Sequence, residues 1–188
     1  MLSAVRLPLD FDAERLEQDV RALPPGTWVP HFNTSYYEGD WSGVALRSVG
    51  GRPEQLYPDP TAEGRYADTE NLAACPSLAA AVAAFLCPLQ AVRLLRLGPG
   101  ARVREHRDYR LGFDDGEVRI HVPITTNPDV EFVVDGASIV MAPGESWYVD
   151  FNLPHSVANA GAADRVHLVV DCVLNDWLRA LIEDAAAR

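Results

Sequence analysis

Short apolar, β-branched runs alternate with turn signals along the second half of the chain. This pattern is typical of an all-β sandwich or barrel, in which short strands follow one another through tight turns. The sequence predicts seven such strands: Ala91–Leu97, Val103–Asp108, Val118–Thr125, Val130–Val134, Ser138–Met141, Trp147–Phe151 and Val166–Val173. Asp135-Gly136 separates two of them and favours a two-residue hairpin, because both central positions of a type I′ turn need positive φ.

Helical patterns are found on either side of this β-rich region. An apolar stripe of helical period follows Asp10 or Asp12, either of which can cap the helix. Pro76 opens an Ala-rich helix that extends to about residue 86. Asn175 can cap a last helix that covers the end of the chain.

Strands with tight turns, flanked by helices, predict a double-sheet jelly roll, the double-stranded β-helix of cupin type. We expect an all-β core with flanking helices in a single domain of residues 1–188. Its parts are an N-terminal helical and loop region (1–90), a jelly-roll core (about 91–174) and a C-terminal helix (175–188). A roll of this kind encloses an inward cavity in which functional side chains can meet.

The charge of the chain excludes two classes of partner. The formal net charge is −11, from 16 basic and 27 acidic residues. Nucleic acids and anionic membranes both require a basic surface, so neither is expected to bind. A small-molecule or peptide partner is left, and the sequence gives no expectation for the oligomeric state.

The sequence predicts a cytoplasmic protein. No run approaches the roughly 18 consecutive apolar residues of a membrane span, and the first 20 residues carry charges where a secretory signal is apolar. The three cysteines, Cys75, Cys87 and Cys172, are odd in number and lack the spacing of a zinc site. Free thiols in a reducing compartment explain them best.

Three residues have the chemistry of a metal site. His106 and Asp108 lie two residues apart on a predicted strand, where residues i and i+2 point to the same face. His155 comes late enough in the chain to lie across the roll and supply a third ligand. Two histidines and one carboxylate form the facial triad of non-haem Fe(II) oxygenases, which leaves positions open for cosubstrate and oxygen. The alternative is that each is a separately satisfied polar residue.

Arg165, at the start of the last predicted strand, is a candidate for binding an anion. Its planar fork matches a carboxylate in a bidentate manner, so it could hold the distal carboxylate of a 2-oxo diacid. A salt bridge with Asp164 or Asp171 is the ordinary alternative. Arg119 and His121 share one face of their strand, opposite an apolar stripe, and this arrangement predicts a polar cavity wall.

Two further arginines are candidates for substrate binding. Arg47 and Arg93 could each face the cavity and bind a substrate carboxylate, or each could be an exposed strand residue that balances acidic neighbours. His167 shares strand parity with Arg165, so it either contacts a ligand or is a hydrogen-bonded core histidine. His31 is expected to be a loop residue without a role.

Five blocks of sequence, taken in order, carry a family resemblance. They are His106-Arg107-Asp108-Tyr109, Arg119-Ile120-His121-Val122, Gly144-Glu145-Ser146-Trp147, Leu153-Pro154-His155-Ser156 and Arg165-Val166-His167-Leu168-Val169-Val170-Asp171. Together they resemble the aspartyl/asparaginyl β-hydroxylase family, and most of all its bacterial free-proline cis-hydroxylase branch. The resemblance covers about residues 41–171.

The resemblance implies a double-stranded β-helix that uses Fe(II), 2-oxoglutarate and O2. By position, it implies iron ligands at His106, Asp108 and His155, a 2-oxoglutarate anchor at Arg165, and a polar pair near the cosubstrate at Arg119 and His121. Unlike the peptidyl-aspartyl hydroxylases, this sequence keeps a carboxylate at Asp108. Unlike the proline enzymes, it ends soon after the core strands.

The function that these observations predict is hydroxylation of an amino acid or amino-acid-like substrate, of the proline or the aspartyl/asparaginyl type. Two alternatives stay open. The substrate could be a residue on a peptide or a carrier protein in natural-product assembly, or the chain could be a non-catalytic metal-binding cupin module. Arg165 favours the hydroxylase, because a simple metal cupin does not need it.

Overall fold

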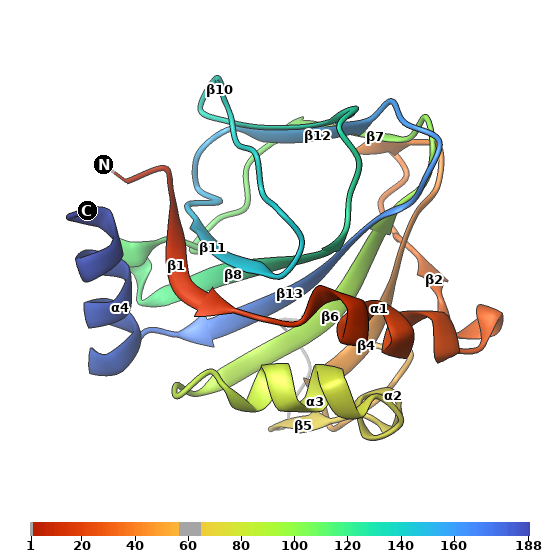
Figure 1. Ribbon diagram of the computed structural model, residues 1–188, viewed down its shortest axis with the longest axis horizontal. Helices are drawn as coiled ribbons and strands as arrows, with labels where there is room; N and C mark the ends of the chain where they lie inside the picture. Colours follow the sequence, from red (N-terminus) through yellow and green to blue (C-terminus); the bar gives the residue numbers. More distant parts are fainter. Residues whose placement is uncertain (1, 57–64) are drawn as a thin grey trace.

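The computed structural model describes residues 2–56 and 65–188, whose strands form two antiparallel sheets that face each other (Figure 1). The large sheet has the order β1 (Ala4–Asp10), β11 (Glu145–Val149), β8 (Glu117–Thr125), β13 (Arg165–Val173), β6 (Leu89–Leu97), β4 (Trp41–Val49) and β2 (Val29–Pro30), with β5 (Tyr66–Asp68) paired to β4. The small sheet has the order β10 (Ala137–Ser138), β9 (Val130–Val134), β12 (His155–Asn159), β7 (Arg102–His106) and β3 (Tyr37–Glu38). The predicted jelly-roll class is confirmed.

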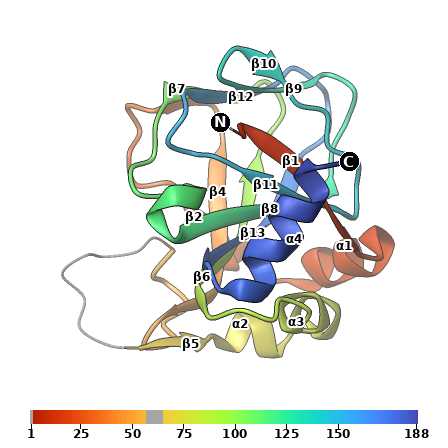
Figure 2. The same ribbon diagram turned by 90° about the vertical axis from the view of Figure 1, so that its left-hand side faces the viewer.

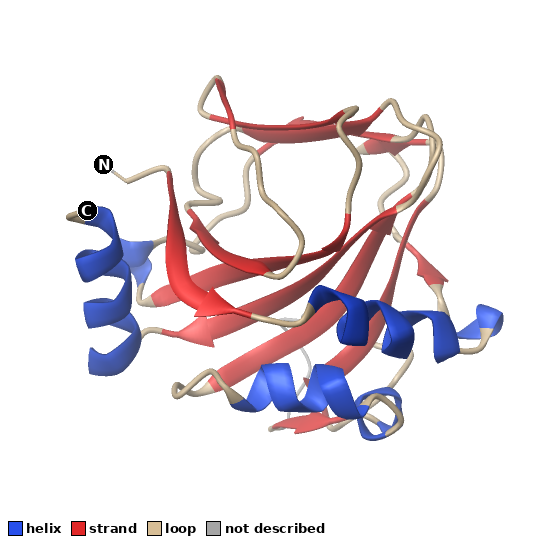
Figure 3. Cartoon of the chain, viewed as in Figure 1, coloured by secondary structure: helices blue, strands red, loops and turns tan. Residues whose placement is uncertain are grey.

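Helices pack against the large sheet on the side away from the small sheet (Figure 3). They are α1 (Ala13–Ala22), α2 (Glu70–Ala73), α3 (Pro76–Ala83) and α4 (Asp176–Ala186), with two 3-10 turns, η1 (Pro25–Thr27) and η2 (Phe113–Asp115). Their apolar side chains meet even-numbered strand residues, such as Ile120 and Leu168, in the main hydrophobic core. Figure 2 shows α4 beside β1, at one end of the sheet.

Local sequence explains where several elements begin and turn. The side chains of Asp12 and Asn175 cap α1 and α4 by accepting the backbone N–H three residues later, at 3.2 and 3.0 Å. Asp135 and Gly136 have φ values of 50° and 76° and form the hairpin between β9 and β10. The capping and hairpin predictions are therefore confirmed at these positions.

The inner face of the large sheet carries a cluster of buried polar residues. Odd-numbered residues of β6, β8 and β13 point toward the small sheet, because their even-numbered neighbours lie in the outer core. Beside apolar residues such as Leu97 and Val169, the polar residues of this set with little or no exposure are Arg93, Arg119, His121, Arg165, His167 and Asp171. Charged residues are rarely buried unless they are paired or serve a ligand, so this face is where a site is expected.

The N-terminal part of the chain contains more strand than the sequence predicts. β4 is a nine-residue strand of the large sheet and β1 forms its edge, so the boundary that places the jelly-roll core after residue 90 is wrong. Alternating Val5, Leu7 and Leu9 are interrupted by Pro8, a combination that suits an edge strand. Pairing with β11, far away in the sequence, defines β1.

Two differences matter for the site. β7 ends at His106 rather than Asp108, and His155 begins the unpredicted strand β12 instead of lying across the roll. β12 has few β-branched residues, so only its pairing with β7 and β9 makes it a strand.

None of the helices in residues 2–56 and 65–188 has the length and apolarity to cross a membrane. A single domain stays a prediction.

Candidate metal centre

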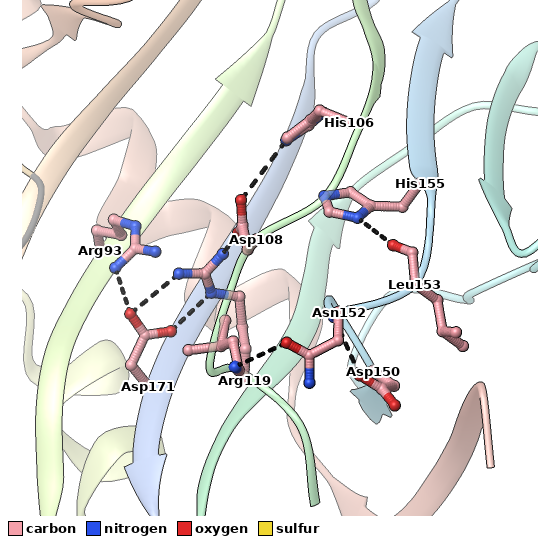
Figure 4. A network of polar contacts seen from close by, with 10 residues as sticks. Arg93, His106, Asp108, Arg119, Asp150, Asn152, Leu153, His155 and Asp171 are labelled. Atoms are coloured by element: carbon pink, nitrogen blue, oxygen red, sulfur yellow. Dashed lines mark hydrogen bonds and ion pairs between the residues drawn. The ribbon is translucent and has the colours of Figure 1, made fainter. Parts of the chain in front are cut away.

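His106 and His155 lie side by side in the small sheet, where they are directly opposite each other on β7 and β12. Their ring centroids are 4.2 Å apart. Asp108 lies just beyond β7, where its backbone N–H donates to the carbonyl of Phe151 at 2.9 Å. One ligand atom of each of the three side chains lies within 4.8 Å of the others. The three predicted residues therefore meet (Figure 4).

Backbone contacts fix which nitrogen of each histidine faces this group. Nδ1 of His106 lies 2.8 Å from the carbonyl oxygen of Arg104, and Nδ1 of His155 lies 3.0 Å from that of Leu153. A carbonyl oxygen only accepts, so each Nδ1 carries the hydrogen. The lone pair of the neutral ring is then on Nε2, which is how protein contacts orient metal-binding histidines.

Asp108 is held in a similar way. Its Oδ2 accepts a hydrogen bond from Nη1 of Arg119 at 2.6 Å, while its Oδ1 lies 3.8 Å from Nε2 of His106. Burial alone would raise the pKa of Asp108, but the charge of Arg119 together with the histidines outweighs burial and lowers it. Burial lowers the pKa of His155 to about 4. Near neutral pH the group therefore consists of a carboxylate and a neutral imidazole beside His106.

The donor set fits a divalent transition metal. Two imidazole nitrogens and one carboxylate oxygen, each with its other polar atom engaged by the protein, match the two-histidine, one-carboxylate pattern of non-haem Fe(II) sites. No carboxylate other than Asp108 belongs to a grouping of this kind in the part of the chain that the structure describes. His106, Asp108 and His155 are thus the residues that could hold the metal.

Arg165 is a candidate for binding an anion on the inner face of the large sheet. It is 4% exposed, and its Nε has no hydrogen-bond partner among the described residues. Its Nη2 donates to Nδ1 of His167 at 3.1 Å, and no carboxylate of the described residues pairs with it. Burial lowers the pKa of Arg165 to about 9. The alternative salt bridge to Asp164 or Asp171 is not formed in this structure.

His121 and His167 form a buried cluster with Arg165. Nδ1 of His121 lies 3.2 Å from Nδ1 of His167, which already accepts from Arg165. Nδ1 of His121 must therefore donate, and the lone pair on its buried Nε2 has no partner among the described residues. Burial, with the charge of Arg165 as the next cause, lowers the pKa values of both histidines well below the usual value. Both rings are neutral.

The other predicted arginines are paired with carboxylates of the chain. Arg93 donates to Asp171 at 2.9 Å, and Arg119 bridges Asp171 and Asp108. Arg47 pairs with Asp68 at 2.6 Å and donates to two backbone carbonyls, one on β6 and one on β5. These contacts do not favour the predicted binding of a substrate carboxylate by Arg47 or Arg93, nor the predicted contact of Arg119 with a cosubstrate.

Aromatic side chains of the N-terminal segment stack on two histidines. Tyr36 stacks on His106 with ring centroids 5.4 Å apart, and His31 stacks on Trp41 at 3.7 Å. Burial lowers the pKa of His31 to about 4, and the charges of Arg93 and His106 add to this effect. His31 therefore has a buried ring stacked on an aromatic neighbour, which its sequence surroundings do not predict. The density of aromatic residues between 28 and 41 is the signal that could have indicated this stacking.

The family model described as aspartyl/asparaginyl beta-hydroxylase matches residues 11–174. The chain belongs to the aspartyl/asparaginyl β-hydroxylase family. The matched range includes all the predicted site residues from Arg47 to Arg165 and the partner Asp171. The family resemblance carried by the five sequence blocks is thereby confirmed.

One curated relative of this family member is L-proline cis-4-hydroxylase of Rhizobium meliloti (strain 1021), which is 29% identical over 177 residues. The match covers 86% of this chain and 57% of the relative, so the chain spans little more than half of that protein.

Two solved structures share the fold of this β-hydroxylase family member. An oxidoreductase of the 2OG-Fe(II) oxygenase family from Burkholderia pseudomallei has a TM-score of 0.59 and 16% identity, over 92% of this chain and 86% of that chain. Viral collagen prolyl hydroxylase vCPH of Paramecium Bursaria Chlorella virus-1, in a 2OG complex, has a TM-score of 0.51 and 9% identity, over 92% and 97%. At these identities the likeness shows the jelly-roll fold.

Proposed function

We propose that this chain is an Fe(II)- and 2-oxoglutarate-dependent hydroxylase of a free amino acid or a small amino-acid-like carboxylate. The observation that carries the proposal is the grouping of His106, Asp108 and His155, whose ligand atoms lie within 4.8 Å of one another. The unpaired Nε of the buried Arg165 adds a place for the cosubstrate. Membership of the aspartyl/asparaginyl β-hydroxylase family supports the same function.

In this proposal the two histidines and Asp108 hold the iron, and Arg165 binds the distal carboxylate of 2-oxoglutarate through its planar fork. When bound, Fe(II) with 2-oxoglutarate and O2 supplies the oxidising power for C–H hydroxylation, with succinate and CO2 as by-products. The role of the protein is to position these groups and to exclude water. His106 and His155 already have fixed tautomers, and His167 already orients Arg165, so little reorganisation is needed on binding.

Three observations support a small substrate. A relative that covers most of this chain is named an L-proline cis-4-hydroxylase. The ring of Tyr36, stacked on His106, offers apolar surface suited to the carbon skeleton of a small molecule. The net charge of −11 repels an acidic protein segment over long range, yet it permits one carboxylate to bind at a local arginine.

A product screen tests the proposal. The protein is incubated with Fe(II), 2-oxoglutarate, ascorbate and each free amino acid, L-proline first, and succinate is measured together with a product of +16 mass. We expect at least one free amino acid to give both. If only a peptide or a carrier-bound residue stimulates succinate release, the substrate class is wrong and the hydroxylase stands. Absence of succinate with every substrate would favour a non-catalytic cupin module.

Variants of the metal ligands complete this test. His106→Ala, Asp108→Ala and His155→Ala should each abolish substrate-dependent succinate release, because each removes one of three ligands. Asp10→Ala is the control, since Asp10 is an exposed carboxylate paired with Arg6 on β1. Full activity in His155→Ala would contradict the assignment of the ligands.

A further inference from the structure

An ion-pair chain connects the proposed metal ligand Asp108 to the interior of the large sheet. Nη1 of Arg119 donates to Oδ2 of Asp108 at 2.6 Å. The other edge of the same guanidinium donates to Asp171, from Nε to Oδ1 at 2.6 Å and from Nη2 to Oδ2 at 3.2 Å. Nη1 of Arg93 donates to Oδ2 of Asp171 at 2.9 Å, so the chain ends on a second arginine (Figure 4).

We propose that Asp171 is a positioning residue for the metal centre, which acts through Arg119 to hold Asp108 with one carboxylate oxygen left for the metal. This inference rests on the proposed function, because it concerns the same metal site. Asp171 does not itself contact His106 or His155; its effect must pass through the guanidinium.

The strand register explains how Asp171 can fix the orientation of Arg119. The two residues are direct partners on β13 and β8, and both side chains point to the inner face. The bidentate contact engages the Nε–Nη2 edge, and it turns Nη1 toward Asp108, to which Nη1 alone donates. Asp171 is 2% exposed, and Arg93 holds it from the other side. The arrangement therefore has little freedom to rotate.

Orientation matters because an arginine fork can engage both oxygens of a carboxylate. If Asp171 did not hold Nε and Nη2, Arg119 could turn its fork onto Asp108 and occupy both oxygens. The guanidinium and the metal would then compete for Oδ1, the oxygen that lies toward Nε2 of His106. In the structure as it stands, Arg119 takes Oδ2 alone.

Charge balance supports the same conclusion. In the ion-pair chain the charge of Arg119 is shared between the carboxylates of Asp108 and Asp171. Replacing Asp171 by Asn would remove one of these two carboxylates and direct the charge of Arg119 toward Asp108. A carboxylate whose charge is neutralised by arginine is a poorer ligand for a divalent cation. Both the geometry and the charge thus predict weaker metal binding.

A purely structural role for Asp171 makes a different prediction. A buried Arg–Asp–Arg cluster could stabilise contacts between β6, β8 and β13 without affecting the metal. In that case its loss would lower the free energy of unfolding and leave the metal affinity of the folded protein unchanged. Metal affinity therefore separates the two roles, whereas stability does not.

The experiment is an anaerobic titration of the purified protein with Co(II), followed by the visible spectrum of the bound ion. Asp171→Asn should raise the dissociation constant for Co(II) about 10–100-fold, the usual effect of losing a contact that orients a metal ligand. Asp19→Asn is the matched control. Asp19 is a buried carboxylate on α1 that accepts from the backbone N–H of Leu78, on the helical side of the sheet. This control should bind Co(II) as the wild type does.

Arg119→Lys provides a second variant if Asp171→Asn does not fold. A lysine ammonium is a point charge that cannot hold two carboxylates through separate edges, so Co(II) binding should weaken to a similar degree. The double variant should bind Co(II) no more weakly than Arg119→Lys alone, because Asp171 acts through Arg119. Additive losses would contradict that route.

The outcomes distinguish this inference from the proposed function. A wild-type protein that binds no Co(II) would overturn both. Wild-type binding together with unchanged affinity and spectrum in Asp171→Asn or in Arg119→Lys would overturn the positioning role and leave the hydroxylase assignment standing. We expect weaker Co(II) binding in Asp171→Asn and in Arg119→Lys, and unchanged Co(II) binding in Asp19→Asn.

Discussion

Arg119 and Arg165 lie on the same polar face of the large sheet, yet their surroundings are opposite. Arg119 contacts two carboxylates of the chain, and these raise its pKa above the ordinary value despite burial. Arg165 pairs with no carboxylate among the described residues, and burial lowers its pKa to about 9. One arginine is satisfied within the protein, and the other is not.

The difference indicates separate tasks. A buried charge without a counter-charge destabilises a fold, so it persists where a ligand supplies the missing partner. A buried charge with full pairing can hold its partners in one geometry. We therefore propose that Arg165 binds an anionic cosubstrate and that Arg119 supports Asp108. Substitutions that change one arginine or one of its partners at a time separate the two tasks.

The largest effect on stability is expected from removing Arg119, which pairs with both Asp108 and Asp171. Arg119→Met leaves the buried carboxylate of Asp171 with Arg93 alone and Asp108 with no cation. Removing one partner of a buried ion pair typically costs about 3–5 kcal/mol, so the free energy of unfolding should fall by about that amount. Urea denaturation of the metal-free protein measures it. A loss within about 0.5 kcal/mol of zero, the usual range for surface substitutions, would show that the pairing adds no stability.

Arg165→Met should have the opposite effect on the metal-free protein. The substitution removes an uncompensated buried charge and keeps an apolar side chain of similar length, so stability should be unchanged or higher. Binding of 2-oxoglutarate should weaken by about 2–5 kcal/mol, as expected when one member of a buried charge pair is truncated. Calorimetric titration with 2-oxoglutarate, in parallel with urea denaturation, checks both parts. A strongly destabilised variant would mean that Arg165 has a structural partner.

Arg165→Lys sharpens the comparison, since it keeps the charge and loses the fork. The affinity for 2-oxoglutarate should fall by about 1–3 kcal/mol, less than in the Met variant, because a lysine cannot make the bidentate contact. The same titration measures the change. Equal affinity in the wild type and the Lys variant would show that charge alone, without geometry, binds the cosubstrate.

The smallest effect is the loss at acid pH of the stability that the ion pairs of Asp171 contribute. Burial would raise the pKa of Asp171, but Arg119 and Arg93 outweigh it and hold the pKa well below the ordinary value near 4. A carboxylate with a depressed pKa contributes stability that is fully present above its unfolded pKa and is lost as the pH falls through the folded value. The stability difference between wild type and Asp171→Asn should therefore shrink, by on the order of 1 kcal/mol, from pH 6 to pH 3. Urea denaturation across this range measures the difference, and a constant gap would contradict the ion pairing.

Sequence alone predicts the candidate metal ligands and Arg165, but it does not predict the ion pairs around Arg119. His106, Asp108, His155 and Arg165 stand in blocks whose residue types and order indicate a metal and an anion site. The contact between Arg119 and Asp171 joins residues 52 positions apart through the register of β8 and β13, which no local pattern specifies. The roles predicted for Arg47 and Arg93 depended on facing the cavity unpaired, and their carboxylate partners were not visible from strand parity.

The fold shows the same division between local and long-range information. Helix caps at Asp12 and Asn175 and the hairpin at Asp135 depend on neighbouring residues, and the sequence predicts them. β1 and β12 depend on partners far along the chain, and the sequence misses them. β12 places His155 opposite His106, so that strand brings together two residues of the candidate metal centre.

An anaerobic titration of the Fe(II)-loaded protein with 2-oxoglutarate, followed by the visible charge-transfer band that a chelated 2-oxo acid gives, tests the proposed iron and cosubstrate sites together. We expect a saturable band in the wild type, no band in His155→Ala, and a band in Arg165→Met that needs far more 2-oxoglutarate. Absence of the band from the wild type, or a band unchanged in both variants, would show that these residues do not hold iron and 2-oxoglutarate.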